Sequence, residues 1–205
     1  MPSARHGDRR REQILEVATD LASAEGLDGL SVGRLAGEAG LSKSGLFAHF
    51  GSKEELQLAA IGAAVAGFER AVLIPTAEAE PGLERLQALL EAWIVHVEQT
   101  PRRGGCFFFA TSSEFASRAG AARDSLAACT GKWLRALERE IRTAVRTGEL
   151  DADPPLLAFR LHAYVQEANW LRQLHDDPQA FELARSAMAT AIAASTAATT
   201  REDNP

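Results

Sequence analysis

Residues 31–55, SVGRLAGEAGLSKSGLFAHFGSKEE, decide how the chain folds around them. Apolar residues recur roughly every three to four positions from Val32 to Ala39, which predicts a short amphipathic helix. Gly40 can adopt the left-handed conformation that often follows a helix, and Ser42 is a good N-cap for the next one. The stretch therefore predicts two short helices joined by a tight glycine turn.

The second of these helices, residues 43–50, presents small and polar residues on its outer side. Leu46 and Phe50 anchor it to a core, while Lys43, Ser44, Gly45 and Ala48 are expected to project outward. An exposed short helix that begins with a cation suits the major groove of DNA. We therefore interpret residues 31–50 as a helix-turn-helix that binds double-stranded DNA.

A third helix is expected to follow immediately and to connect the helix-turn-helix to the rest of the chain. Ser52 and Glu55 have the spacing of a capping box, which starts a helix at Lys53 that runs toward Ile74. Lys53 lies where the helix dipole disfavours a cation, so we expect a DNA phosphate beside it. The candidate DNA-binding residues are Ser31, Ser42, Lys43, Ser44, Gly45, Phe47, Ala48, His49 and Lys53.

The run from Gly40 to Leu56, GLSKSGLFAHFGSKEEL, resembles the DNA-binding signature of the TetR family of transcriptional regulators. This resemblance implies a three-helix N-terminal domain, a divergent helical C-terminal domain that binds a small ligand and dimerises, and ligand-controlled release from an operator. The family usually has a tyrosine that touches backbone phosphate where this chain has Phe47. Only the packing of the ring is carried over at that position.

Length and composition support an all-α protein with two parts. The chain has 205 residues and 46% hydrophobic residues, enough for a sizeable core. We expect a helix-turn-helix domain at residues 1–53 and a helical ligand-binding and dimerisation domain at residues 54–205. The first part holds seven basic and seven acidic residues, which leaves the acidic excess of the chain in the second part. The DNA-binding end is therefore expected to face the duplex.

Neither a membrane segment nor a cysteine framework is expected. No uninterrupted apolar run approaches the roughly 18 to 20 residues of a membrane span, and the arginine-rich start lacks a signal-peptide core. We expect a disordered tip, a first helix over residues 10–24 and a cytoplasmic protein. Cys106 and Cys129 are interpreted as buried, reduced thiols, with a redox role as the alternative.

Aromatic residues are concentrated in the expected second domain, where some could line a cavity for a small-molecule effector. The candidate ligand-binding residues are Trp93, Phe107, Phe108, Phe115, Trp133, Gln166 and Trp170. Each of the aromatic residues could equally be plain core. The histidines do not have metal-ligand spacing, no nucleophile with its base is recognisable, and we expect no metal site, catalytic residue or cofactor.

The last two expected helices are candidates for a homodimer interface over residues 154–196. Asp153 with Pro154, and Asp177 with Pro178, are typical of helix starts, and the final helix is rich in alanine. A two-fold pair of such helices would form a four-helix bundle. Two other functions remain open, namely a DNA-binding regulator without an effector and an all-helical enzyme. Neither operator nor effector identity follows from the sequence.

Overall fold

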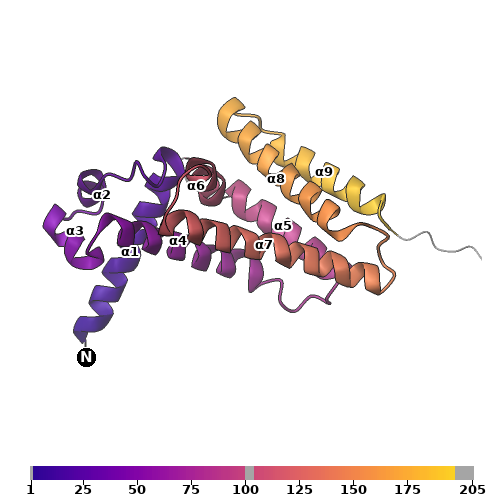
Figure 1. The fold of residues 1–205 in the computed structure, drawn as a ribbon, viewed down its shortest axis with the longest axis horizontal. Coiled ribbons are helices and arrows are strands. Elements are labelled where there is room, and N and C mark those ends of the chain that lie inside the picture. The colour runs from indigo at the N-terminus through magenta and orange to yellow at the C-terminus, as the bar shows by residue number, and fades with distance from the viewer. Residues whose placement is uncertain (1, 100–103, 197–205) are drawn as a thin grey trace, which may run out of the picture. The chain divides into compact units, whose positions relative to one another are not determined.

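The computed structural model describes residues 2–99 and 104–196, with side chains described from residue 9 onward. Within those ranges the chain is all-α, as predicted, apart from an isolated bridge between Leu150 and Thr196. The elements, labelled in Figure 1, are α1 (Pro2–Glu25), α2 (Val32–Glu38), α3 (Lys43–Phe50), α4 (Lys53–Phe68), the π-helical turn η1 (Glu69–Leu73), α5 (Leu83–Gln99), α6 (Phe107–Phe115), α7 (Ala121–Arg146), α8 (Pro154–His175) and α9 (Ala180–Ala193).

Two compact units make up the chain. Unit 1 comprises Met1–Ala71 and His96–Gly131, and unit 2 comprises Val72–Val95 and Lys132–Pro205. The boundary expected between residues 53 and 54 falls inside unit 1, at the start of α4. This placement follows from packing, because α4 lies against α1 and shares its core.

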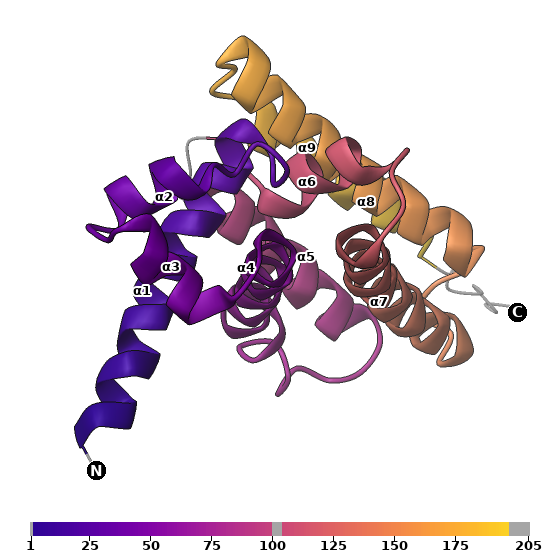
Figure 2. The ribbon, with the colours of Figure 1, turned by 60° about the vertical axis from the view of Figure 1, so that its left-hand side comes forward.

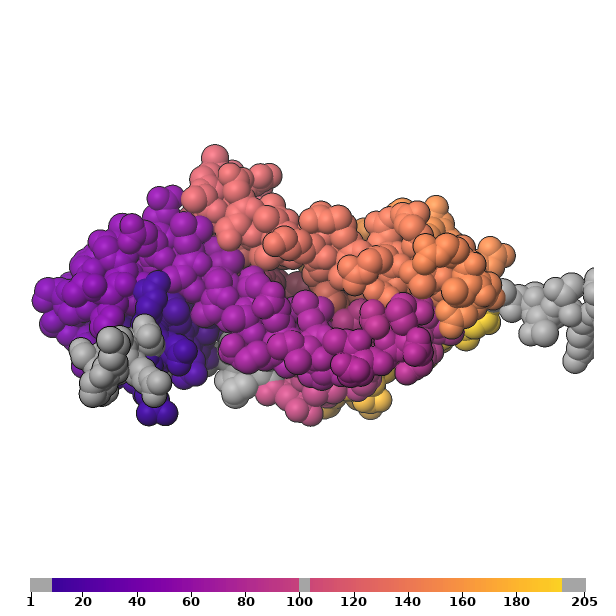
Figure 3. Space-filling view, turned by 90° about the horizontal axis from the view of Figure 1, so that it is seen from below, coloured from indigo at the N-terminus to yellow at the C-terminus, as the bar shows by residue number. Residues whose placement is uncertain are grey.

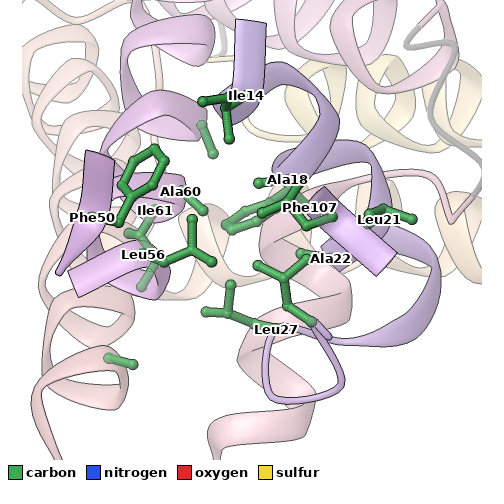
Figure 4. Packing of buried hydrophobic residues seen from close by; sticks show 14 of the residues in the cluster. Ile14, Ala18, Leu21, Ala22, Leu27, Phe50, Leu56, Ala60, Ile61 and Phe107 are labelled. Carbon is green, nitrogen blue, oxygen red and sulfur yellow. The ribbon is translucent and has the colours of Figure 1, made fainter. Parts of the chain in front are cut away.

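Unit 1 is organised around α1, which packs against α2, α4 and α6 (Figure 2). In the core, Phe107 from α6 inserts among side chains of α1 and α4, including Ala18 and Leu56 (Figure 4). Phe107 is fully buried. Removing a phenylalanine ring from such a site typically costs about 3–5 kcal/mol. The helix-turn-helix therefore rests on a core to which α6, far along the chain, also contributes.

Unit 2 contains the antiparallel pair α8 and α9, which lie side by side (Figure 1). The Asp153 side chain accepts a hydrogen bond from the Leu156 backbone N–H at 2.8 Å, with Pro154 in the first turn, which confirms the predicted helix start. The end of α9 is tied to the chain between α7 and α8, because Asp151 N donates to Ser195 O at 2.7 Å. One side of each helix faces the core, through Leu157, Leu161, Val165, Phe181, Ala184, Met188 and Ile192.

Three helix ends differ from the sequence prediction. The expected disordered tip is wrong, because α1 starts at Pro2, and proline is well suited to the first position of a helix. The N-cap of α9 is Gln179, because the Asp177 side chain accepts from Gln179 N at 2.8 Å and closes a turn before the helix. The connecting helix ends in the π-turn η1, which periodicity did not indicate.

Among the described residues, the segment Lys53–Leu73 is long and apolar enough to cross a membrane by length and composition alone. Its apolar side includes Leu56, Ala60, Ile61 and Ala64, which are buried in the unit 1 core. Such a helix is typical of the connecting helix of a globular domain, whose inner face must be apolar to pack.

Candidate nucleic-acid interface

Side-chain caps and a left-handed glycine shape the turn between α2 and α3. The Ser31 Oγ accepts a hydrogen bond from Arg34 N at 3.4 Å, and Ser42 Oγ accepts one from Gly45 N at 3.0 Å. Gly40 has a φ of 62°, a conformation that favours glycine. Each cap satisfies an amide that the helix itself cannot pair. The predicted helix-turn-helix is therefore confirmed at both caps, Ser31 and Ser42, and at the turn residue Gly40.

Two consecutive arginines of α1 bind the carboxyl ends of the two short helices. Arg10 Nη2 donates to the Ala39 carbonyl oxygen at 2.6 Å, and Arg11 Nη1 donates to the His49 carbonyl oxygen at 3.0 Å. The Arg11 guanidinium also lies 4.4 Å from the centre of the Phe50 ring. A cation at a helix C-terminus pairs with free carbonyls and with the helix dipole. These arginines thus fix the orientation of α2 and α3, a role that their positions in the sequence do not reveal.

The outer surface of α3 carries most of the predicted DNA-binding residues. Leu46 and Phe50 are buried, whereas Lys43, Ser44 and Ala48 are exposed and Phe47 is 42% exposed. Gly45 and His49 are half-buried. Figure 3 shows residues of this region, in purple, at the surface of unit 1. The fold therefore brings these predicted residues together on one accessible helix.

Lys43 folds back over the first turn of α2. A Cβ built on Gly33 would lie 3.1 Å from Lys43 Cε and 3.5 Å from its Nζ, and 3.7 Å from Ser31 Oγ. A side chain at position 33 would therefore push the end of the lysine side chain aside by a few tenths of an ångström. Among the described residues, Lys43 Nζ has no ion-pair partner. The start of α3 and the start of α2 thus present a cation and a hydroxyl in the same place.

Lys53 has a protein partner instead of standing alone at the start of α4. Its Nζ donates to the Asp28 carbonyl oxygen at 2.6 Å and to Asp28 Oδ1 at 3.2 Å. Arg118 Nη1 binds Asp28 Oδ2 at 2.6 Å. The Arg118 guanidinium and, after it, the Lys53 ammonium hold the pKa of the Asp28 carboxyl below its usual value. The cation that the dipole of α4 disfavours is therefore already compensated by a carboxylate.

Glu114 of α6 and Gln57 of α4 hold the loop between α1 and α2. The Glu114 carboxylate accepts hydrogen bonds from Leu27 N at 2.6 Å and from Asp28 N at 3.0 Å. Gln57 Nε2 donates to the Leu27 carbonyl oxygen at 3.1 Å. The loop leads directly to Ser31, so these contacts set where α2 begins. No sequence pattern indicates this role of Glu114, because the paired residues lie 86 and 87 positions apart.

The candidate ligand-binding residues belong to both units. In unit 1, Phe107 and Phe115 are buried and Phe108 is half-buried. In unit 2, the Trp93 ring lies 5.1 Å from that of Trp133 and 5.4 Å from that of His162. Burial lowers the pKa of His162.

Gln166 and Trp170 lie apart from the interior, because both are exposed on the surface of α8. The buried apolar side of α8, which includes Leu161 and Val165, faces the core instead. Their contact with a ligand stays a prediction. Within the described ranges, no group of three or more His, Cys, Asp or Glu side chains could hold a metal ion.

Two family descriptions match the sequence. “Bacterial regulatory proteins, tetR family” matches residues 14–60, from within α1 to within α4. “Tetracyclin repressor-like, C-terminal domain” matches residues 82–188, which is half of the chain. The first match contains every candidate DNA-binding residue, and the second contains every candidate ligand-binding residue.

Solved structures with the same fold cover nearly the whole chain. A TetR transcriptional regulator from Chloroflexus aurantiacus is 25% identical, with a TM-score of 0.84 over 94% of this chain and 98% of that chain. PfmR, a TetR family regulator from Thermus thermophilus, is 28% identical, with a TM-score of 0.67 over 88% and 97%. AibR, whose structure was solved in complex with isovaleryl coenzyme A and operator DNA, is 24% identical, with a TM-score of 0.72 over 88% of this chain and 97% of that chain. This last similarity shows a shared fold.

Proposed function

Because this chain belongs to the TetR family of transcriptional regulators, we propose that it is a homodimeric repressor that binds a palindromic operator and is released by a small molecule. The observation that carries this proposal is the accessible surface of α3, which presents Lys43, Ser44, Phe47 and Ala48 beside the capped start of α2. A helix held in this way can enter the major groove of DNA. A cytoplasmic location is part of the same proposal.

The individual DNA contacts follow from the positions of the polar groups. We assign Lys43 and Ser31 to phosphate contacts at the start of α2, because both groups lie beside Gly33. Ser42 and Gly45 lie at the first turn of α3, where we expect them to approach the DNA. We expect His49 to donate a hydrogen bond to a phosphate. Lys53 can reach a phosphate if that phosphate competes with Asp28.

Operator binding by a Lys43→Ala variant tests the proposal. If Lys43 neutralises one phosphate in each half-site, the slope of log affinity against log salt should be shallower in the variant, by about 1 for each DNA-binding domain of the dimer. Affinity should fall by a similar factor on all sequences. Lys132→Ala, which removes a lysine from α7 in unit 2, is the matched control. Unchanged affinity together with an unchanged slope would contradict the assignment of Lys43.

The exposed apolar stripe of α8 supports a dimer through residues 154–196. Large apolar side chains are exposed at a helical spacing along this stripe, at Leu156, Phe159, Trp170 and Leu174. Leu183 of α9 is also exposed. A stripe of this kind is costly in water and is typical of an interface. Large side chains on α8, and not only the small ones of α9, would then form the contact.

A charged residue in this stripe should break the dimer. Phe159 is 68% exposed, so Phe159→Glu leaves the protomer core intact while placing like charges near the two-fold axis. Sedimentation should show monomers, and operator binding should weaken. Leu134→Glu, a similar change at an exposed leucine of α7, should leave the dimer intact. Dimers of Phe159→Glu with normal DNA binding would place the interface elsewhere.

The effector is proposed to be an apolar or amphipathic small molecule, since six of the seven candidate residues are aromatic. All three tryptophans, Trp93, Trp133 and Trp170, lie in unit 2, so intrinsic fluorescence reports on this part of the protein. Isovaleryl coenzyme A, which AibR binds, is a suitable first probe, followed by a library of small apolar compounds. Binders that never change operator affinity would favour a regulator without an effector. Turnover of a compound by the purified protein would favour an enzyme.

A further inference from the structure

The outward direction of α3 is centred on an alanine. Successive residues of an α-helix are rotated by about 100°, so the side opposite the buried Leu46 and Phe50 is centred on Ala48. Ser44 and Gly45 lie next to Ala48 around the axis, and Phe47 lies further to one side. The centre of this face is therefore small enough for the helix to approach base edges closely.

Two polar side chains near this face, Ser42 and Ser44, are hydrogen-bonded within α3, and a third, Lys43, lies toward α2. Ser42 Oγ accepts from Gly45 N, and the Ser42 and Ser44 hydroxyls are 3.0 Å apart and hydrogen-bonded. The Lys43 side chain lies over Gly33 of α2. The apolar groups that are open at the surface of α3 are the Ala48 methyl and the Phe47 ring. Phe47 is the only large apolar side chain exposed in the described part of unit 1.

We propose that Ala48 and Phe47 read thymine in each operator half-site by apolar contact with its C5-methyl group. The inference rests on the proposed DNA-binding function and names the base that this helix recognises. Thymine alone presents a methyl group in the major groove, and alanine and phenylalanine are suited to contact it. Adenine and guanine are usually read by the side-chain amides of Asn or Gln and by Arg or Lys. The outward face of α3 lacks all of these except Lys43, which lies at its edge.

The methyl group can be removed from the DNA without changing any hydrogen bond. The full-length protein first selects its operator from random double-stranded DNA. Each recurrent thymine is then replaced, one position at a time, by deoxyuridine. Loss of one methyl contact should weaken binding about four-fold for each altered half-site, because one buried carbon group is worth about 0.8 kcal/mol. At least one thymine of each half-site should show this penalty.

Variants of the two side chains identify which one makes the contact. In Phe47→Ala and Ala48→Gly, the deoxyuridine penalty should disappear at the thymine that the altered residue reads, while circular dichroism verifies that the helices are retained. Ser113→Ala alters an exposed residue of α6 in the same unit, so it should keep the full penalty. If Ala48→Gly loses helicity, Phe47→Ala and Phe47→Leu still carry the comparison, and Phe47→Leu should retain part of the penalty.

Two results would overturn the inference while leaving DNA binding intact. One is an operator in which no deoxyuridine substitution changes affinity. The other is a penalty of equal size in the wild type and in both variants, because the methyl would then act through DNA shape. Failure to select any sequence from the random pool would instead contradict the proposed function itself.

Discussion

Lys53 Nζ lies 2.6 Å from the carbonyl oxygen of Asp28 and 3.2 Å from its Oδ1. The contact joins the first residue of α4 to the loop between α1 and α2, and it compensates a cation that the dipole of α4 disfavours. Arg118 binds the second carboxylate oxygen of Asp28. A DNA phosphate that approaches the start of α4 must therefore compete with Asp28 for Lys53.

Asp28→Asn is expected to strengthen DNA binding and to lower thermal stability. Removal of the carboxylate relieves its repulsion from phosphate and releases Lys53, so the salt dependence of binding should become steeper by about 1 for each phosphate gained. Arg118 and Lys53 lose a charged partner in the folded protein. Operator titrations at several salt concentrations measure the effect. Asp124→Asn, at the start of α7, changes net charge equally, and an equal gain from both variants would contradict a specific role for Asp28.

Phe47→Tyr is expected to preserve the fold and to strengthen operator binding by about 0.5–1.5 kcal/mol, the net scale of one hydrogen bond. The ring is 42% exposed, so a hydroxyl can be added without burying an unpaired polar group. The operator affinities of the two proteins, measured at one salt concentration, provide the test. The expected acceptor is a backbone phosphate at the tip of the ring, while the face of the ring stays on the thymine methyl. Weaker binding with unchanged helicity would contradict a phosphate within reach of the hydroxyl.

Glu114→Gln is expected to destabilise unit 1 by about 1–3 kcal/mol, because a glutamine has one acceptor oxygen where the carboxylate serves two backbone amides. Leu27 N or Asp28 N would then face an N–H donor. Urea unfolding followed by circular dichroism gives the free energy of unfolding. Ser113→Ala changes the neighbouring exposed residue of α6 and serves as the control. Equal stability of the Glu114→Gln variant and the control would show that the loop does not depend on the carboxylate.

Two glycine substitutions should change stability in opposite directions. A Cβ on Gly104 would lie 1.8 Å from the carbonyl oxygen of Ser23, a backbone atom that cannot rotate away, so Gly104→Ala should cost at least about 1–3 kcal/mol. A Cβ on Gly62 in α4 meets no atom within 4 Å, so Gly62→Ala should add about 0.5–1 kcal/mol. Thermal melts of both variants measure the difference. A stable Gly104→Ala protein would contradict the close approach of this segment to α1.

Stability should decrease as the pH falls below the ordinary pKa of histidine, which is about 6.5. Burial lowers the pKa of His162 in the folded protein, so the unfolded chain binds the proton first and acid favours unfolding. His162→Phe keeps a ring against Trp93 and should flatten the dependence between about pH 5 and 7. Urea midpoints across this range test it. His175→Phe, at an exposed histidine, is the control. An unchanged pH dependence of stability in His162→Phe would exclude His162 as the source of that dependence.

Helix starts and turns could be predicted because their signals are local. Ser31, Ser42, Ser52 and Asp153 each accept a hydrogen bond from an amide three residues later, and Gly40 supplies the left-handed turn. Such contacts depend only on the adjoining residues, so the helix-turn-helix and the outward position of Lys43, Ser44 and Ala48 followed from the sequence. The π-turn after α4 and the Gln179 cap of α9 were missed.

Pairs of residues far apart in the chain were decided by the tertiary structure alone. Arg11 binds the carbonyl of His49, Lys53 binds Asp28, and Glu114 binds the loop at Leu27, across 25 to 87 positions. Periodicity gives the spacing of an apolar stripe but not the surface that the stripe faces, so the sequence did not reveal that Trp170 is exposed on α8. The sequence by itself determined the helices and the DNA-reading motif. Packing decided which charges meet and which apolar faces stay open, because both depend on how distant segments come together.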